Sequence, residues 1–173
     1  GHTVKLRFMH GQSYGYNAYF EGDTVAFVRA STMERFASAC IASVKRLTDR
    51  TVEVAFDRDI PKELELNHDC VENISCTPEV EIRNCYFTRT STRGTLMTTP
   101  RKVIIANNTY YKTGMSAILI EGDAEGWYES GPVKDVLIQN NIFIDCAYNG
   151  GPEYAVIALN PSNTIIDAAH PVH

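Results

Sequence analysis

The 173-residue sequence lacks the features that mark several large classes of protein. It has no apolar run near the roughly 20 residues that a membrane-spanning helix needs. Its lysines and arginines are scattered and its formal net charge is −5. This argues against a nucleic-acid partner, because phosphate binding needs clustered basic residues. No secretion signal stands at the start, where we expect Gly1 and His2 to be a cut end or a tag remnant.

The cysteines form no recognisable framework. Their number is odd and their spacing is irregular, which excludes a pattern of paired disulfides. No Cys or His pair follows Cys70 and Cys76 at the spacing of a zinc site. We therefore expect buried structural thiols rather than redox or metal-binding groups. The five are Cys40, Cys70, Cys76, Cys85 and Cys146.

Residues 1–66 are predicted to form a small β-barrel or β-sandwich domain. Residues 23–29 and 51–56 alternate between apolar and polar side chains, as half-buried strands do. Residues 32–47 could be drawn as a helix, but the β-branched residues near its end and the turn signal after it favour a strand over about 39–47.

Residues 67–173 contain a repeat. Residues 80–87, 103–110 and 136–143 share one pattern, in which an Ile is followed two residues later by Asn and five residues later by an aromatic residue. The copies recur at intervals in the range of about 20–50 residues, which indicates a solenoid. Short Val- and Ile-rich strands broken by Asn predict a right-handed parallel β-helix. Ile82, Ile105 and Ile138 should stack inside it.

Two further columns of residues follow from the same repeat. Asn84, Asn107 and Asn140 should stack at a turn, because Asn tolerates left-handed backbone and its amide can bond the next repeat. Phe87, Tyr110 and Phe143 should fill the next corner. We therefore assign the asparagines a structural role rather than a ligand-binding one.

The second interval of the repeat is longer than the first, and the excess falls in an acidic loop at residues 121–131. Insertions in solenoids are often on the binding face. The loop holds the only tryptophan of the chain, Trp127. An aromatic ring beside carboxylates suits carbohydrate, since the ring packs on a sugar face and the carboxylates bond hydroxyls or transfer protons. A solvated loop and a calcium site are the alternatives. The carboxylates are Glu121, Asp123, Glu125 and Glu129.

Arg89 and Arg93 lie in one predicted turn that follows the Phe87 corner. Neighbouring strands of a sheet are only about 4.8 Å apart. The turn would therefore lie near the acidic loop if both leave the same side of the β-helix, and its arginines would bind substrate hydroxyls or a carboxylate. A solvated turn whose arginines pair with glutamates is equally compatible with the sequence.

Three segments together resemble a known family. They are residues 77–87, residues 93–100 and residues 117–131, the last with its Gly-Asp-Ala-x-x-Trp-Tyr-Glu-Ser-Gly run. These segments resemble the exo-α-1,3-galactosidases of glycoside hydrolase family 110, and residues 22–30 and 49–54 resemble the β-domain of that family. The resemblance covers nearly the whole chain. Because family members are several times longer, it implies that the chain is a C-terminal portion of such an enzyme.

The resemblance implies a secreted or periplasmic bacterial enzyme that removes terminal α-1,3-linked galactose with inversion, using two carboxyl groups and no metal or cofactor. Asp123 and Glu129 lie in the matching run and are the expected acid/base pair. Trp127, Glu121, Arg89 and Arg93 are then expected to bind the substrate. Asp69 and Glu153 are further carboxylates, for which a structural role is favoured.

Two other functions stay open from the sequence. A carbohydrate-binding or structural β-helix without catalysis would use the same loop. A polysaccharide lyase would need a basic catalytic residue, yet Lys102, Lys112 and Lys134 are not grouped with acids. We also predict self-association, because an uncovered end of a β-helix exposes strand edges that can pair with a second copy.

Overall fold

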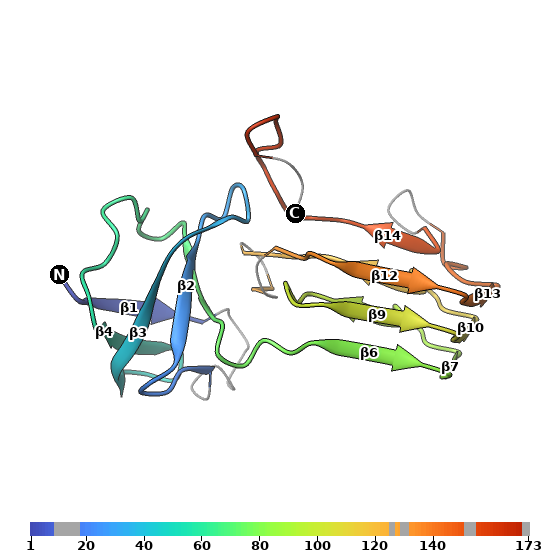
Figure 1. Cartoon of the computed structure of the whole chain (residues 1–173), viewed down its shortest axis with the longest axis horizontal. Helices are drawn as coiled ribbons and strands as arrows, with labels where there is room; N and C mark the ends of the chain where they lie inside the picture. Colours follow the sequence, from blue (N-terminus) through green and yellow to red (C-terminus); the bar gives the residue numbers. More distant parts are fainter. Residues whose placement is uncertain (9–17, 125–126, 129–131, 151–154, 171–173) are drawn as a thin grey trace.

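The computed structural model describes residues 1–8, 18–124, 127–128, 132–150 and 155–170. These residues form strands joined by turns and loops, and they include no α-helix. Five strands pair in one antiparallel sheet, and nine form three parallel sheets of three strands each. Figure 1 shows the five-stranded sheet on the left and the parallel strands stacked on the right.

The five-stranded sheet has the order β1-β4-β3-β2-β5. Val52, Val54 and Phe56 on one face of β4 are buried, whereas the residues between them are partly exposed. They pack with Val25 and Phe27 of β2, which accounts for the alternation in β4. β2 is instead buried from Val25 to Val28. The strands are β1 (Thr3–Arg7), β2 (Thr24–Val28), β3 (Arg35–Arg46), β4 (Thr51–Phe56) and β5 (Cys70–Asn73).

Two details of this sheet bear on the sequence predictions. Residues 39–46 lie in β3, so the predicted strand is confirmed and the helical alternative is wrong. β5 pairs antiparallel with β2, so the five-stranded sheet continues beyond residue 66. The chain therefore returns to this sheet once more before the parallel strands begin.

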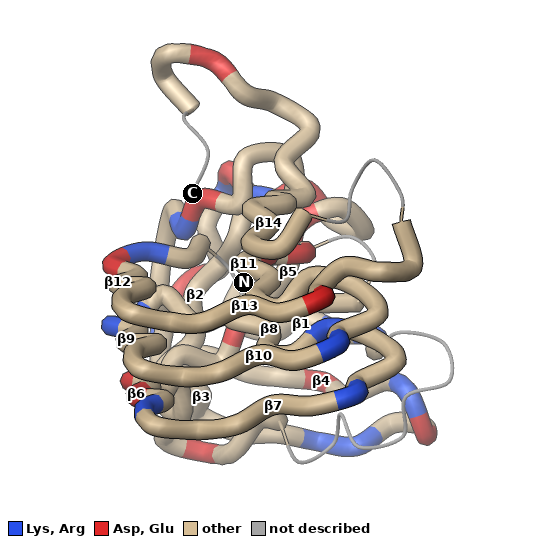
Figure 2. The backbone as a smooth tube through the Cα atoms, turned by 90° about the vertical axis from the view of Figure 1, so that its right-hand side faces the viewer, with Lys and Arg blue, Asp and Glu red and all other residues tan. Residues whose placement is uncertain are grey.

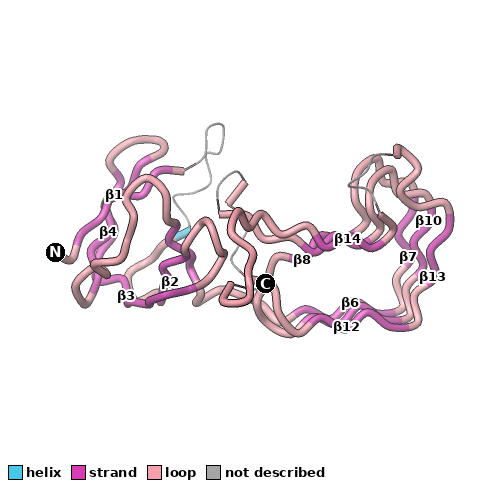
Figure 3. The backbone as a smooth tube through the Cα atoms, turned by 90° about the horizontal axis from the view of Figure 1, so that it is seen from above, coloured by secondary structure: helices cyan, strands magenta, loops and turns pink. Residues whose placement is uncertain are grey.

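The three parallel sheets surround one core, as Figure 3 shows from above. Each sheet takes every third strand, so successive strands lie in different sheets and the chain returns to the first sheet after three strands (Figure 2). The first sheet contains β6 (Val80–Arg83), β9 (Val103–Ala106) and β12 (Val136–Gln139), the second β7 (Tyr86–Thr88), β10 (Thr109–Tyr111) and β13 (Ile142–Ile144), and the third β8 (Thr95–Met97), β11 (Ile118–Ile120) and β14 (Ile157–Leu159).

The predicted repeat register is confirmed. Ile105 pairs with Ile82 on one side and Ile138 on the other. The aromatic column is also present: the Tyr110 ring stacks between Phe87 and Phe143, with centroids 4.7 and 5.4 Å apart. Tyr110 is fully buried. Stacked rings of this kind add to the free energy gained from burial alone.

The asparagine turn is confirmed in its backbone. Asn84, Asn107 and Asn140 have φ angles of 56°, 57° and 54°, the left-handed conformation that Asn tolerates. The amide that links the repeats, however, belongs to the following residue. The Asn108 amide nitrogen donates to the carbonyl of Ile82 at 3.0 Å, and its oxygen accepts from the N–H of Cys85 at 2.9 Å.

The five cysteines are free thiols, and none belongs to the fully buried core. Cys76 and Cys85 are exposed, so the prediction of a buried thiol is wrong for these two. Among the residues that the structure describes, no helix is long and apolar enough to span a membrane.

Asp57, which follows β4, should make the stability of the five-stranded sheet sensitive to acid. Hydrogen bonds from the Arg58 guanidinium and the Cys40 N–H lower the pKa of its carboxyl group to about 2. An unfolded aspartate has a pKa of roughly 3.9. The stabilisation by Asp57 is therefore complete above about pH 4 and is lost as the pH falls towards 2. We expect Asp57→Asn to flatten the decrease in unfolding free energy over this range, measured by urea denaturation, and an unchanged slope would contradict the assignment.

Candidate active site

A cleft of about 1130 Å³ lies between the five-stranded sheet and the parallel sheets. Its walls come from β1, β5 and residues 64–69 on one side, and from residues 96–99 on the other. Asp123, Ala124 and Tyr128 of the acidic loop line the same cleft. A cleft between two structural units is a common place for a ligand site. The loop that the sequence singled out therefore borders this cleft.

The Asp123 carboxylate anchors the acidic loop. Asp123 is buried, with 6% of its surface exposed, and its Oδ2 accepts a hydrogen bond from the backbone N–H of Trp127. Trp127 itself is 65% exposed. A buried carboxylate thus holds the backbone of an aromatic residue that lies at the surface. Glu125 and Glu129, like Glu153, lie outside the described residues.

The other predicted site residues do not gather at this point. Glu121 accepts a hydrogen bond from Asn160 at 3.0 Å and lines a second, smaller hollow. Arg89 and Arg93 lie between β7 and β8, whereas the acidic loop leaves after β11, at another corner of the three-sheet core. The structure therefore does not bring the two arginines beside the acidic loop.

The two arginines have local surroundings of their own. The Arg89 guanidinium lies 5.9 Å from the centroid of the Tyr111 ring, within the range of a cation–π contact. The Nε of Arg93 is buried and has no hydrogen-bond partner within the described part of the chain. The sequence left open that Arg89 and Arg93 pair with glutamates. Among the described residues, neither arginine forms such an ion pair.

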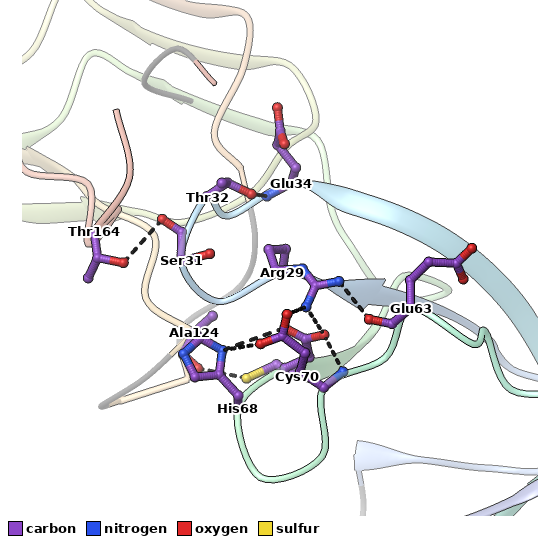
Figure 4. Close-up of polar contacts among 11 residues, drawn as sticks. Arg29, Ser31, Thr32, Glu34, Glu63, His68, Cys70, Ala124 and Thr164 are labelled. Carbon is purple, nitrogen blue, oxygen red and sulfur yellow. Dashed lines mark hydrogen bonds and ion pairs between the residues drawn. The ribbon is translucent and has the colours of Figure 1, made fainter. Parts of the chain in front are cut away.

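An ion-pair cluster that the sequence did not reveal lies beside the cleft (Figure 4). Arg29 Nη1 is 2.8 Å from Asp69 Oδ2 and 2.7 Å from Glu65 Oε1, while Nη2 donates to the carbonyl of Glu63 at 2.7 Å. The Asp69 side chain is fully buried, and His68 Nδ1 lies 3.7 Å from its second oxygen. A buried carboxylate with a cationic partner is costly to break. The structure thus supports the structural role favoured for Asp69.

The five-stranded sheet also contacts the acidic loop directly. Ala124 is buried in a small apolar cluster with Val28, Ala30 and Met33, and Cys70 packs against the same cluster. The Cys70 thiol donates to the carbonyl of Ala124 at 2.7 Å. The only sequence signal for this contact was the small apolar residue inside an otherwise polar loop.

The hydroxyl group of Tyr19 closes one wall of the cleft. It donates to the carbonyl of Val71 at 2.6 Å, and burial raises its pKa well above the ordinary value. It is therefore a neutral donor at neutral pH. Within the described part of the chain, no group of three or more His, Cys, Asp or Glu side chains is arranged to hold a metal ion.

Comparison with known proteins identifies the first part of the chain and then relates the whole of it to one group of enzymes. Residues 3–71 match the family model of GLAA-B beta-barrel domain II. An alpha-1,3-galactosidase A of Bacteroides fragilis is 82% identical over 171 residues, which are 99% of this chain and 28% of that protein. The enzyme of the same name from Bacteroides thetaiotaomicron is 40% identical over 161 residues, 92% of this chain and 27% of that protein. For Akkermansia muciniphila the identity is 39% over 143 residues, 83% of this chain and 24% of that protein.

The resemblance to α-1,3-galactosidases that the sequence predicted is thereby confirmed, and residues 3–71 match a β-barrel domain model. The chain spans about 28% of the length of the first curated relatives that it matches.

Proposed function

We propose that the chain is part of a glycoside hydrolase that removes terminal α-1,3-linked galactose from glycans with inversion. The relatives are named alpha-1,3-galactosidases, and the 82% identical match covers 171 residues, 99% of the chain. The observation that carries the proposal is a buried carboxylate, Asp123, that lines the cleft and also bonds the backbone of an exposed tryptophan, Trp127. The same proposal makes the parent enzyme a secreted or periplasmic bacterial protein.

The proposal divides the chain into a barrel at residues 1–66 and right-handed β-helix coils at 67–173. The three parallel sheets around one core support such coils. The acidic loop is then an insertion between two coils, where solenoids carry their binding sites. β5 connects the two parts, since it follows residue 66 and pairs with β2.

In the proposed mechanism Asp123 and Glu129 are the two carboxyl groups. An inverting enzyme needs one acid to protonate the leaving oxygen and one base to activate a water molecule, with the two carboxyls roughly 6.5–9.5 Å apart. Asp123 borders the cleft and is held in place by its hydrogen bond to Trp127. The exposed indole ring packs against the C–H face of the galactose. Glu121, which lines the second hollow, is proposed to bind a substrate hydroxyl group there.

The test is hydrolysis of an α-1,3-linked galactobiose by a protein of the relatives' full length that contains this sequence. General acid–base catalysis contributes about 10²- to 10⁴-fold, so Asp123→Asn and Glu129→Gln should each lose roughly that factor in kcat. Proton NMR of the first product formed should show the β-anomer of galactose. Asp145→Asn, at an exposed aspartate after β13, is the matched control. Rates like the wild type in both variants would refute the assigned roles.

A non-catalytic galactoside-binding domain is the second candidate, and the exposure of Trp127 favours it as much as catalysis. Titration with galactobiose, followed by the fluorescence of Trp127, separates the two functions. Binding without release of galactose supports the binding domain, whereas turnover excludes it.

A further inference from the structure

The turn between β2 and β3, residues 29–34, contacts three distant parts of the chain (Figure 4). Its first residue is held by the carboxylates of residues 65 and 69, and its apolar side chains cover Ala124. Its outer side receives the C-terminal segment, whose Thr164 and Ile165 N–H groups both donate to the carbonyl of Ser31 at 2.9 Å. The turn is therefore a junction between the barrel domain and the acidic loop.

The conformation of this turn is strongly fixed. The carbonyl of Arg29 accepts from the N–H of Met33 at 2.8 Å, and the N–H of Arg29 donates to the carbonyl of Glu34 at 2.9 Å. Met33 has a φ of 61° and only 1% of its surface is exposed. A buried non-glycine residue in the left-handed region persists only where its surroundings hold it there. Here the apolar contacts with Ala30 and Ala124 do so.

The contact with Ala124 bears directly on the candidate active site. Ala124 follows Asp123 in the chain and is held on two sides, by the Met33 cluster and by the Cys70 thiol. Asp123 in turn holds the backbone of Trp127. A displacement of Ala124 would therefore move both the buried carboxylate and the exposed indole ring.

We propose that Met33 and Cys70 are positioning residues, through which the barrel domain sets the orientation of Asp123 and Trp127. The consequence for catalysis rests on the proposed function, but the positioning itself does not. The barrel domain then contributes to the active site, because the acidic loop packs against it. Cys70 acts through its hydrogen bond to the Ala124 carbonyl, and Met33 acts through packing.

The first test measures Trp127 in the 173-residue chain, where it is the only tryptophan. We expect Cys70→Ala and Met33→Ala to increase the amplitude of nanosecond motion in time-resolved fluorescence anisotropy. Loss of one hydrogen bond should speed exchange of the Trp127 amide hydrogen by about fivefold. Cys70→Ser and Met33→Leu, which retain a donor and an apolar side chain, should recover most of the wild-type values. Cys40→Ala, whose thiol lies in β3 against the Gly22 carbonyl, is the matched control.

The second test measures galactobiose hydrolysis in the full-length protein. Misplacement of a catalytic group lowers kcat by roughly 10- to 100-fold, so the two alanine variants should lose kcat in that range and their conservative counterparts should not. Wild-type anisotropy and amide exchange in both alanine variants would overturn the positioning role. If the wild type itself releases no galactose, the proposed function fails, while the Trp127 measurements still decide the positioning role.

Discussion

Replacing Tyr110 with alanine is expected to lower the free energy of unfolding by about 3–5 kcal/mol, the range for a large aromatic residue removed from a core. The Tyr110 ring is fully buried between Phe87 and Phe143 and belongs to the cluster that contains Ile105 and Ile118. Its removal leaves a cavity in the middle of the aromatic column. Each neighbouring repeat contributes one ring, Phe87 or Phe143, to this column.

Tyr86→Ala provides the matched control, because Tyr86 lies in the neighbouring strand β7 but is 62% exposed. Surface substitutions of this kind change stability by no more than about 0.5 kcal/mol. Urea denaturation followed by circular dichroism measures both variants. Equal losses for Tyr110→Ala and Tyr86→Ala would show that the aromatic column does not stabilise the parallel sheets. Loss of the parallel sheets alone, with the five-stranded sheet intact, would show that the two parts unfold separately.

The repeats could be predicted because their pattern is local. The same apolar residue recurs at the same place in each repeat, so Ile82, Ile105 and Ile138 identify the pairing register without knowledge of the fold. The left-handed turn was predictable for a similar reason, since Asn84, Asn107 and Asn140 occupy it in all three copies. Strand β3 also followed from local composition, because its β-branched residues outweigh a helical interpretation.

The contacts around the acidic loop could not be predicted in this way. Arg29, Asp69 and Ala124 are brought together by the pairing of β2 with β5 and by the seating of the loop on the barrel. Each residue is unremarkable within its own segment, so no period or motif marks it. Arg89 and Arg93 were expected near the loop only if both turns leave the same side of the β-helix, but the turns leave at different corners. Each repeat has three strands. The arginine turn follows the second strand of its repeat, whereas the acidic loop follows the third strand of the next repeat.

Asn108 illustrates a further limit of the repeat pattern. The equivalent positions hold Cys85, Asn108 and Asn141, so the column looks irregular in the sequence. The structure explains the exception. Each of these asparagines bonds the preceding repeat, Asn141 to the carbonyl of Ile105 and Asn108 to the carbonyl of Ile82. Cys85 lies in the first repeat that the structure describes, where β6 and β7 are sheet edges with no preceding strand to bond.

Asn108→Ala is therefore expected to be severely destabilising although it removes only a short side chain. Only 1% of the Asn108 surface is exposed, and its amide bonds the Cys85 N–H, the Ile82 carbonyl and the Asn141 side chain. Loss of a partner for a buried polar group costs roughly 1–3 kcal/mol, and the substitution removes three partly buried hydrogen bonds. Alanine has no polar atom with which to bond either backbone group.

Gln139→Ala is the control for Asn108→Ala, because it removes an amide side chain from an exposed position on β12. Hydrogen exchange of the Cys85 N–H gives a local measurement beside the global unfolding curve. It should exchange far faster in Asn108→Ala than in Gln139→Ala, because its only acceptor among the described residues is the Asn108 amide oxygen. A global loss without faster exchange at Cys85 would mean that Asn108 stabilises the fold by filling space. If the Cys85 N–H stays protected from exchange and stability is unchanged, the hydrogen bonds of the Asn108 side chain do not link the repeats. The repeats would then be held together by their backbone pairing and apolar core alone.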